Sequence, residues 1–253
     1  METKMISKTA QVTLLFWMMK IIATTLGETL GDFLAMTLKL GYGVGIMITL
    51  SFFIIVLIVQ LLVKNYIPFL FWVVIVATTT LGTEISDFID RSLGLGYTGG
   101  TAILLFGLLL TLFVWHKTHK TIKIFPITLR NQELYFWLAI LFSNSLGTAF
   151  GDFLTDVLGL SYGVGALVTA AIIALVVLVH YQTKINEVVL FWIAFIFTRP
   201  FGATFGDFLT KPIEKGGLNL GTLFATTVSI GLMVVLILIE HKRRTLNTVK
   251  NAL

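Results

Sequence analysis

The chain of 253 residues has no cysteine and little charge, since only 12% of its residues are Asp, Glu, Lys or Arg. The lack of cysteine excludes disulfide bonds, thiolate metal sites and cysteine nucleophiles. Soluble domains carry roughly 25% charged residues, whereas the low charge here comes with 57% hydrophobic residues and a mean hydropathy of +0.94. This composition excludes an ordinary soluble domain and predicts an integral membrane protein.

Eight apolar runs of about 18 to 24 residues each are close to the ~20 residues that a helix needs to cross a bilayer. They lie at residues 13–36, 44–63, 67–89, 99–116, 133–155, 164–181, 188–209 and 221–240. The first run is too long for a signal-peptide core, contains Lys20 and lacks a small-residue cleavage site, so we expect it to remain as a helix. The predicted fold is an all-α integral membrane protein with eight transmembrane helices, in a single membrane domain covering residues 1–253.

The basic residues lie mostly on one side of the predicted membrane. That side holds the N-terminal segment, the loops after the even-numbered helices, including a basic linker at residues 116–132, and the C-terminal tail. The other side holds only Lys39, Arg91, Lys211 and Lys215. Because positive residues favour the cytoplasmic side, we expect a multi-pass inner-membrane protein with both termini cytoplasmic. The pI of about 9.4 then reflects topology and contact with the lipid bilayer, and nucleic acid is not an expected partner.

The sequence repeats itself four times. In each copy a Phe-Trp pair is followed by an Asp fifteen residues after the Trp, as in Trp17 and Asp32, Trp72 and Asp87, Trp137 and Asp152, and Trp192 and Asp207. A patch rich in glycine and tyrosine follows in the first three copies, at residues 41–45, 96–100 and 161–165, and is replaced by KPIEKGGLNLG in the fourth. We expect four two-helix repeats at approximately residues 12–64, 67–117, 132–182 and 187–241. All four share one orientation because each repeat has an even number of helices.

This pattern resembles a family of bacterial integral membrane proteins of unknown function. Members of that family have four tandem repeats, each with two transmembrane segments and a characteristic tryptophan. The resemblance covers the chain from Phe16 to about Ile239. It implies the fold and topology described above but no chemistry, so the function has to be inferred from the residues.

Each odd-numbered helix has one polar face. At 100° per residue, the positions seven, eleven and fifteen residues after each Trp share an arc of about 80°. Those positions hold Thr24, Glu28 and Asp32; Thr79, Thr83 and Asp87; Asn144, Thr148 and Asp152; and Arg199, Ala203 and Asp207. Small residues at the edge of the arc let helix backbones approach closely. We expect the odd-numbered helices inside and the even-numbered helices outside, with the four aspartates converging on one polar cavity that opens toward the outside.

Ionisable residues embedded in a membrane are costly, at about 2.5 to 3.5 kcal/mol each, and are functional by default. The candidate ion-binding residues are Glu28, Asp32, Glu84, Asp87, Asp152, Asp207, Thr24, Thr79 and Asn144. Among them, the candidate metal ligands are Glu28, Asp32, Asp87, Asp152 and Asp207. Lys20 and Arg199 are expected to balance the charge, with Arg199 paired to Glu28 or Glu84. Oxygen ligands without cysteine or deeply embedded histidine favour H⁺, Na⁺ or hard divalent cations such as Mn²⁺ and Mg²⁺.

These features favour a secondary, proton-coupled cation transporter without enzymatic activity or cofactor. The alternative is a membrane scaffold or lipid-interacting protein whose aspartates only cap helix hairpins. The GYGVG patch is similar to a potassium-channel filter, but a loop of about eight residues leaves no room for a re-entrant pore helix, and glycine at a tight turn explains the patch better. An intramembrane aspartyl protease is disfavoured because no GxGD motif is present. The repeated tryptophans fit a belt at the lipid interface, and their angular position near the polar face leaves a cytoplasmic gate as the alternative.

Overall fold

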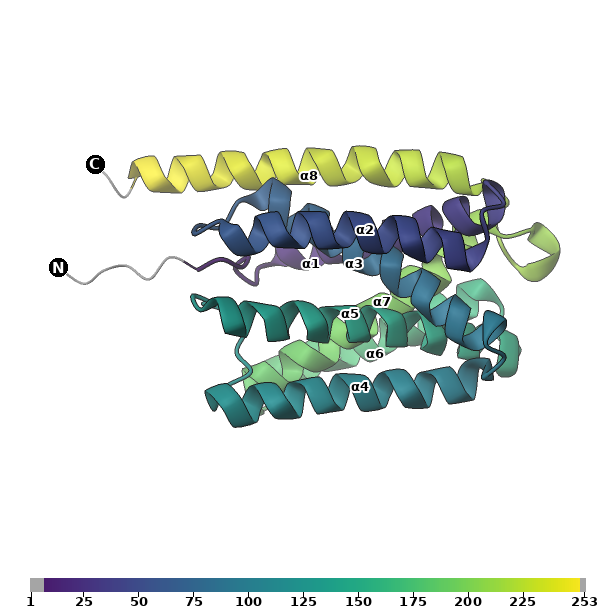
Figure 1. Ribbon diagram of the computed structural model, residues 1–253, viewed down its shortest axis with the longest axis horizontal. Helices are drawn as coiled ribbons and strands as arrows, with labels where there is room; N and C mark the ends of the chain where they lie inside the picture. Colours follow the sequence, from purple (N-terminus) through teal and green to yellow (C-terminus); the bar gives the residue numbers. More distant parts are fainter. Residues whose placement is uncertain (1–6, 251–253) are drawn as a thin grey trace.

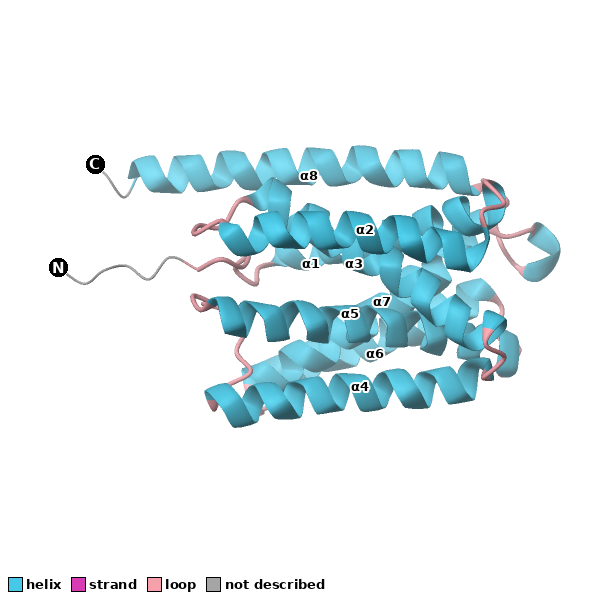
Figure 2. Ribbon diagram, in the orientation of Figure 1, coloured by secondary structure: helices cyan, strands magenta, loops and turns pink. Residues whose placement is uncertain are grey.

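The computed structural model describes residues 7–250, with side chains described as far as residue 246, and every regular element in this part of the chain is a helix (Figure 2). The long helices are α1 (Leu14–Asp32), α2 (Gly41–Leu62), α3 (Pro68–Asp87), α4 (Gly96–His119), α5 (Arg130–Asp152), α6 (Tyr162–Gln182), α7 (Glu187–Thr210) and α8 (Thr222–Lys250). The π-helical turns η1 (Phe33–Thr37), η2 (Phe88–Ser92) and η3 (Phe153–Val157) continue α1, α3 and α5, and a 3-10 turn η4 (Ile213–Lys215) follows α7. The predicted linker at residues 116–132 contains the segment between α4, which ends at His119, and α5, which begins at Arg130.

Local sequence signals mark where several helices begin. The hydroxyl of Thr13 accepts a hydrogen bond from the main-chain N–H of Phe16 and caps α1. Pro68 occupies the first turn of α3, where its missing N–H costs nothing. Gly41 and Gly96 have φ angles of 73° and 66°, and only glycine adopts such values freely. The glycines of the repeated patch therefore turn the chain into α2 and α4, as predicted.

The odd-numbered helices form an inner ring in which α1 packs on α3, α3 on α5, α5 on α7 and α7 on α1. The even-numbered helices surround this ring, and each packs on the odd-numbered helix of the next repeat: α2 on α3, α4 on α5 and α6 on α7. The last helix, α8, closes the circle by packing on α1. Figure 1 shows the long helices running side by side along the length of the molecule. The arrangement of odd helices inside and even helices outside follows the prediction, while the docking onto the next repeat is a feature that the pattern did not specify.

The helices have the length and composition of membrane spans. Seven of those in the described part of the chain, α2 to α8, are long and apolar enough to cross a bilayer. In α3, α5 and α7 between 56% and 72% of the most apolar stretch is buried, against 17% to 28% in the even-numbered helices. The molecule is therefore a membrane protein with an apolar outer surface. The remaining helix, α1, is more polar because it carries Lys20, Glu28 and Asp32.

Glycine lies at each contact between neighbouring helices of the inner ring. The four contacts join Gly27 to Thr79, Gly82 to Asn144, Gly147 to Arg199 and Gly202 to Thr24. A Cβ atom added to Gly27 would lie 2.3 Å from Thr79 Oγ1, which is too close for any side chain. Each repeat thus docks a glycine against the residue seven positions after the Trp of the next repeat, and four equivalent contacts close the ring.

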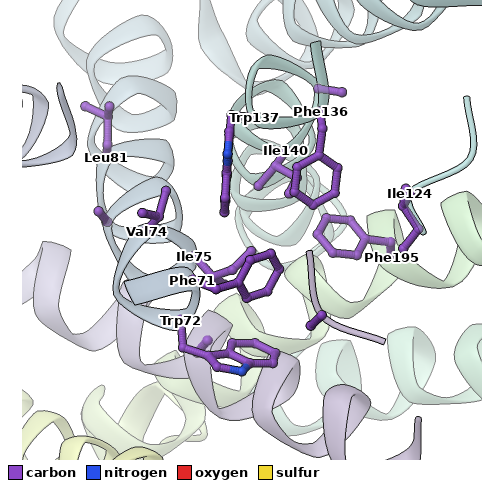
Figure 3. Packing of buried hydrophobic residues seen from close by; sticks show 14 of the residues in the cluster. Phe71, Trp72, Val74, Ile75, Leu81, Ile124, Phe136, Trp137, Ile140 and Phe195 are labelled. Atoms are coloured by element: carbon purple, nitrogen blue, oxygen red, sulfur yellow. The ribbon is translucent and has the colours of Figure 1, made fainter. Parts of the chain in front are cut away.

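The Phe-Trp pairs lie in the first turns of the odd-numbered helices and form an aromatic layer at that end of the ring. Figure 3 shows two of these pairs, Phe71 with Trp72 and Phe136 with Trp137. The ring of a Phe packs against the Trp of the following repeat, with centroids 5.5 Å apart for Phe16 and Trp72 and 5.4 Å apart for Phe71 and Trp137. The interpretation of the tryptophans as a lipid belt was wrong for three of the four: Trp72, Trp137 and Trp192 are only 1–4% exposed. They lie on the inner helices, so they face neighbouring repeats instead of lipid.

Candidate functional site

The predicted polar faces line the axis of the inner ring and are almost completely buried. Most of the candidate site residues lie in two layers of side chains along this axis. The residues seven positions after each Trp are 0% exposed, and they are Thr24, Thr79, Asn144 and Arg199. The acid ring, at 2–4% exposure, consists of Asp32, Asp87, Asp152 and Asp207. The first three of these aspartates are the last α-helical residues before the π turns η1, η2 and η3, a local geometry that is frequent at functional sites.

Two cations that the sequence analysis assigned only to topology lie in this ring. Arg91 in η2 and Lys211 after α7 each follow a ring aspartate by four residues, at the same place in the second and fourth repeats. The equivalent residues in the first and third repeats are Met36 and Asp156. The spacing of four from a repeated aspartate was the signal that could have identified both cations, because residues four apart share a helix face.

Lys211 joins two aspartates from different repeats. Its ammonium group donates a hydrogen bond to Asp32 Oδ2 at 2.5 Å and lies 3.2 Å from Asp207 Oδ1. Burial alone would lower the pKa of Lys211, but the carboxylates of Asp207 and Asp32 outweigh it and raise the pKa above its ordinary value. Lys211 is therefore a stable positive charge between α1 and α7.

Arg91 joins the other two aspartates and is held by more partners. Its guanidinium group lies 3.5 Å from Asp87 Oδ1 and 3.2 Å from Asp152 Oδ2. It also donates hydrogen bonds to the hydroxyl groups of Tyr42, at 2.8 Å, and Tyr97, at 3.3 Å. Both tyrosines come from the repeated glycine- and tyrosine-rich patch. The acid ring thus divides into two pairs, one fastened by an arginine with several contacts and one by a lysine with few.

Three of the predicted metal ligands come together. Oxygen atoms of Glu28, Asp32 and Asp207 lie within 4.8 Å of one another, and all three side chains are buried. The other two predicted ligands, Asp87 and Asp152, belong to the arginine pair instead. Buried carboxylate oxygens at this spacing fit a hard divalent cation or the ammonium group of Lys211.

Glu28 forms the predicted ion pair with Arg199, one helical turn from the acid ring. Arg199 Nη2 lies 2.9 Å from Glu28 Oε2 and donates a second hydrogen bond to Thr83 Oγ1 at 2.5 Å. Both charged side chains are buried, and Arg199 is 0% exposed. The pair therefore connects three repeats through α1, α3 and α7.

The neutral candidates Thr24, Thr79 and Asn144 fasten helices to one another. Thr79 Oγ1 donates to the main-chain oxygen of Ala23 at 3.0 Å, and Thr24 Oγ1 donates to that of Thr198 at 3.3 Å. Asn144 Oδ1 accepts a hydrogen bond of 2.9 Å from the ammonium group of Lys20. Lys20 is 0% exposed and lies 4.0 Å from the centre of the Phe195 ring. It is a second buried cation on the axis and has no salt bridge to a carboxylate in the described chain.

Glu84 does not join the acid ring. It lies one position further along α3 than the polar stripe, and its carboxylate fills the space beside Gly45 of α2. Neither of its oxygens accepts a hydrogen bond from a described residue. The predicted pairing of Arg199 with Glu28 or Glu84 is therefore realised with Glu28 only.

A cavity of about 310 Å³ lies at the end of the acid ring. Its lining includes two ring aspartates and both ring cations, and consists of Met36, Arg91, Asp152, Thr155, Asp156, Tyr162, Asp207, Lys211 and Lys215. Asp32 and Asp87 lie just behind this lining, each joined through Lys211 or Arg91 to an aspartate that faces the cavity. The four aspartates converge as predicted, but only two of them reach the cavity.

The opposite end of the ring is closed by the N-terminal segment. The ammonium group of Lys8 forms a salt bridge with Glu133, which is 0% exposed in the first turn of α5. Gln60 of α2 donates to the same carboxylate at 2.8 Å. Thr9 Oγ1 donates to the main-chain oxygen of Ile124 in the linker at 2.7 Å. The N-terminal segment, residues from the first and third repeats and the linker therefore seal this end beyond the aromatic layer.

Comparison with known proteins gives one match. Four successive segments, at residues 15–66, 70–121, 135–186 and 190–245, match the family described as Repeat of Unknown Function (DUF347). These segments correspond to the four repeats seen in the structure. No curated protein and no solved structure is detectably similar to the chain.

Proposed function

Since the chain belongs to the DUF347 family, whose description assigns no activity, we propose a function from the acid ring: a secondary membrane carrier that exchanges a hard divalent cation, such as Mn²⁺ or Mg²⁺, for protons. In this proposal all eight helices, α1 included, cross the inner membrane. The ends at which the odd-numbered helices begin face the cytoplasm, because the basic loops lie there. The cavity beside the acid ring then faces the outside.

Three buried carboxylates that converge from two helices carry this proposal. Glu28, Asp32 and Asp207 offer oxygen ligands within 4.8 Å of one another, the spacing that a hard cation requires. Asp207 lines a cavity through which an ion can enter, and Lys211, which also lines it, joins Asp207 to Asp32. A stabilising role alone is a poor explanation, since buried ion pairs contribute little net stability compared with apolar packing.

The closed end supports a carrier over a channel. Lys20 and Arg199 are buried on the axis between the acid ring and the aromatic layer, and the guanidinium charge of Arg199 there repels a passing cation. The aromatic layer and the Lys8–Glu133 pair block the far end. In an alternating-access carrier, each conformational state exposes the binding site to one side of the membrane only. A site that is open at one end and closed at the other fits one such state.

Proton coupling follows from the charge of the site. A buried carboxylate that loses its cation is left in surroundings of low dielectric, where the charged form is costly. Taking up a proton removes that cost, so protons and cations compete for the same oxygen atoms. A cation bound from one side is thereby exchanged for protons released to that side.

The alternative role as a scaffold predicts that each aspartate fastens its own hairpin. Asp32 instead pairs with Lys211 of the fourth repeat, and Asp152 pairs with Arg91 of the second. These bonds connect repeats across the ring and favour a shared central site over four separate caps.

Transport by the purified protein in liposomes, with a pH-sensitive dye inside, tests the proposal. A panel of Mn²⁺, Mg²⁺, Ca²⁺ and Na⁺ should contain at least one cation whose gradient drives proton movement. Asp32→Asn and Glu28→Gln should abolish this movement, because neither amide offers a charged ligand or a titrating group. Thr24→Val, which removes only a neutral hydroxyl group, should cost less. Transport at the wild-type rate by both carboxylate variants would leave the acids with a structural role and support the scaffold.

A further inference from the structure

We propose that Lys211 is a built-in competitor for the cation, occupying the space between Asp32 and Asp207 until a divalent cation displaces it. This inference rests on the proposed function, since it specifies how the same site is loaded. It also assigns unequal roles to the two halves of the acid ring. The lysine half, formed by Asp32, Asp207 and Lys211, is the exchangeable cation site. The arginine half, formed by Asp87, Asp152 and Arg91, is a permanent structural group.

The contacts of the two ring cations differ in number and kind. Arg91 contacts three carboxylates, those of Asp87, Asp152 and Asp156, and donates to two tyrosine hydroxyl groups. A guanidinium group held at so many points has a fixed geometry. The ammonium group of Lys211 has two carboxylate partners, and its other neighbour is the sulfur of Met36 at 3.9 Å. A flexible lysine with two partners is the easier cation to displace.

Each half has a buried carboxylate oxygen without a hydrogen bond from the described residues, Asp87 Oδ1 in the arginine half and Asp207 Oδ1 in the lysine half. Of these two residues, Asp207 is the one whose carboxylate lies beside those of Glu28 and Asp32. Asp207 is 4% exposed, and its Oδ1 accepts no hydrogen bond of good geometry from the described residues, although Lys211 Nζ lies 3.2 Å away. A buried carboxylate oxygen without a hydrogen bond is costly. A metal ion bound by Asp32, Asp207 and Glu28 would use this oxygen directly.

Charge balance favours a divalent occupant. Glu28, Asp32 and Asp207 carry three formal negative charges, and Arg199, paired with Glu28, carries one positive charge. The remainder is −3 + 1 = −2, which Lys211 or a monovalent cation reduces only to −1. A divalent cation that replaces the lysine brings the buried group to zero. Lys211 lines the cavity, so its side chain has space to withdraw into on the side from which the cation enters.

Binding of Mn²⁺ to the purified full-length protein tests this, with free Mn²⁺ measured by electron paramagnetic resonance. Lys211→Met introduces the residue that the first repeat carries at this position, Met36, and should tighten Mn²⁺ binding about tenfold by removing the competing charge. Arg91→Met is the matched control and should not tighten it. A second measurement uses the wild-type protein: Mn²⁺ should increase the labelling of Lys211 by an amine-reactive reagent several-fold, with no increase in an Asp32→Asn variant.

The inference fails if Lys211→Met binds Mn²⁺ no more tightly than the wild type, if Arg91→Met tightens binding equally, or if Mn²⁺ binds without exposing Lys211. Absence of Mn²⁺ binding by every variant would also overturn it. Its failure is distinct from failure of the proposed function. Transport that persists with an unchanged affinity in Lys211→Met refutes the competitor alone, whereas tighter binding by that variant without any transport in liposomes refutes the carrier alone.

Discussion

Replacement of Arg199 by methionine should destabilise the protein more than any other single change on the axis. Arg199 is 0% exposed and donates to Glu28 Oε2, to Thr83 Oγ1 and, at 3.4 Å, to the main-chain oxygen of Thr24. Methionine fills much of the same volume but leaves Glu28 charged and buried, and the Thr83 hydroxyl group at 3.3 Å is then its one donor among the described residues. Removal of one partner from a buried ion pair costs about 3–5 kcal/mol, and we expect a loss of unfolding free energy in this range.

The matched variants separate charge from packing. Glu28→Gln keeps an oxygen acceptor for Arg199 and should cost about 1.5–3 kcal/mol, the value of a hydrogen bond to a charged group. The double variant, Arg199→Met with Glu28→Gln, removes both charges and should cost less than Arg199→Met alone. Thr148→Val, at the level of Glu28 in the third repeat, changes a hydroxyl group that bonds only within its own helix and should cost about 1 kcal/mol or less.

Unfolding of each variant by sodium dodecyl sulfate in mixed micelles, followed by tryptophan fluorescence, provides the measurement. The expected result is a strongly non-additive cycle, because the two residues share one buried contact. Additive losses, or an Arg199→Met variant as stable as the wild type, would refute the assignment of this pair as a buried charge contact.

Two further predictions concern the packing of the ring and its closed end. Gly27→Ala places a methyl group against Thr79 and should cost about 1–3 kcal/mol of unfolding free energy in the same mixed-micelle assay. The control is Gly43→Ala in α2, where the added methyl group meets no atom within 4 Å and should be neutral or stabilising. Equal effects would contradict the close helix contact. Glu133→Gln breaks the salt bridge with Lys8 and should increase the rate at which a protease cleaves the N-terminal segment. Mass spectrometry of the fragments measures this rate. Lys117→Gln, on the exposed end of α4, is the control and should leave the rate unchanged. An unchanged cleavage rate in Glu133→Gln would show that the salt bridge does not hold this end closed.

The inner faces of the odd-numbered helices were predictable because helical periodicity needs no knowledge of partners. A constant spacing of fifteen residues from Trp to Asp fixes the angle between the two side chains in every repeat. The polar residues Thr24, Thr79 and Asn144 were assigned to the interior on this basis, and all are 0% exposed. Local geometry and composition were sufficient for this part of the fold.

Pairings across the ring were not predictable, because they depend on the order in which the repeats meet. Lys211 reaches Asp32 only because α7 packs on α1 and closes the circle. Arg91 similarly reaches Asp152 because α3 packs on α5. In the sequence both cations have the position of ordinary loop charges. The error over the tryptophans has the same origin, since an amphipathic side chain near a helix end fits a lipid interface or a contact between repeats equally well.

The location of a bound ion would test the central claim most directly. A crystal structure of the protein with Mn²⁺, with data collected for the anomalous signal of manganese, should show one peak within ligand distance of Asp32 and Asp207 beside Glu28, with the side chain of Lys211 withdrawn toward the cavity. A peak in the arginine half of the ring, a peak at Glu84 outside the ring, or no peak on the axis at Mn²⁺ concentrations that drive transport would contradict the proposed site.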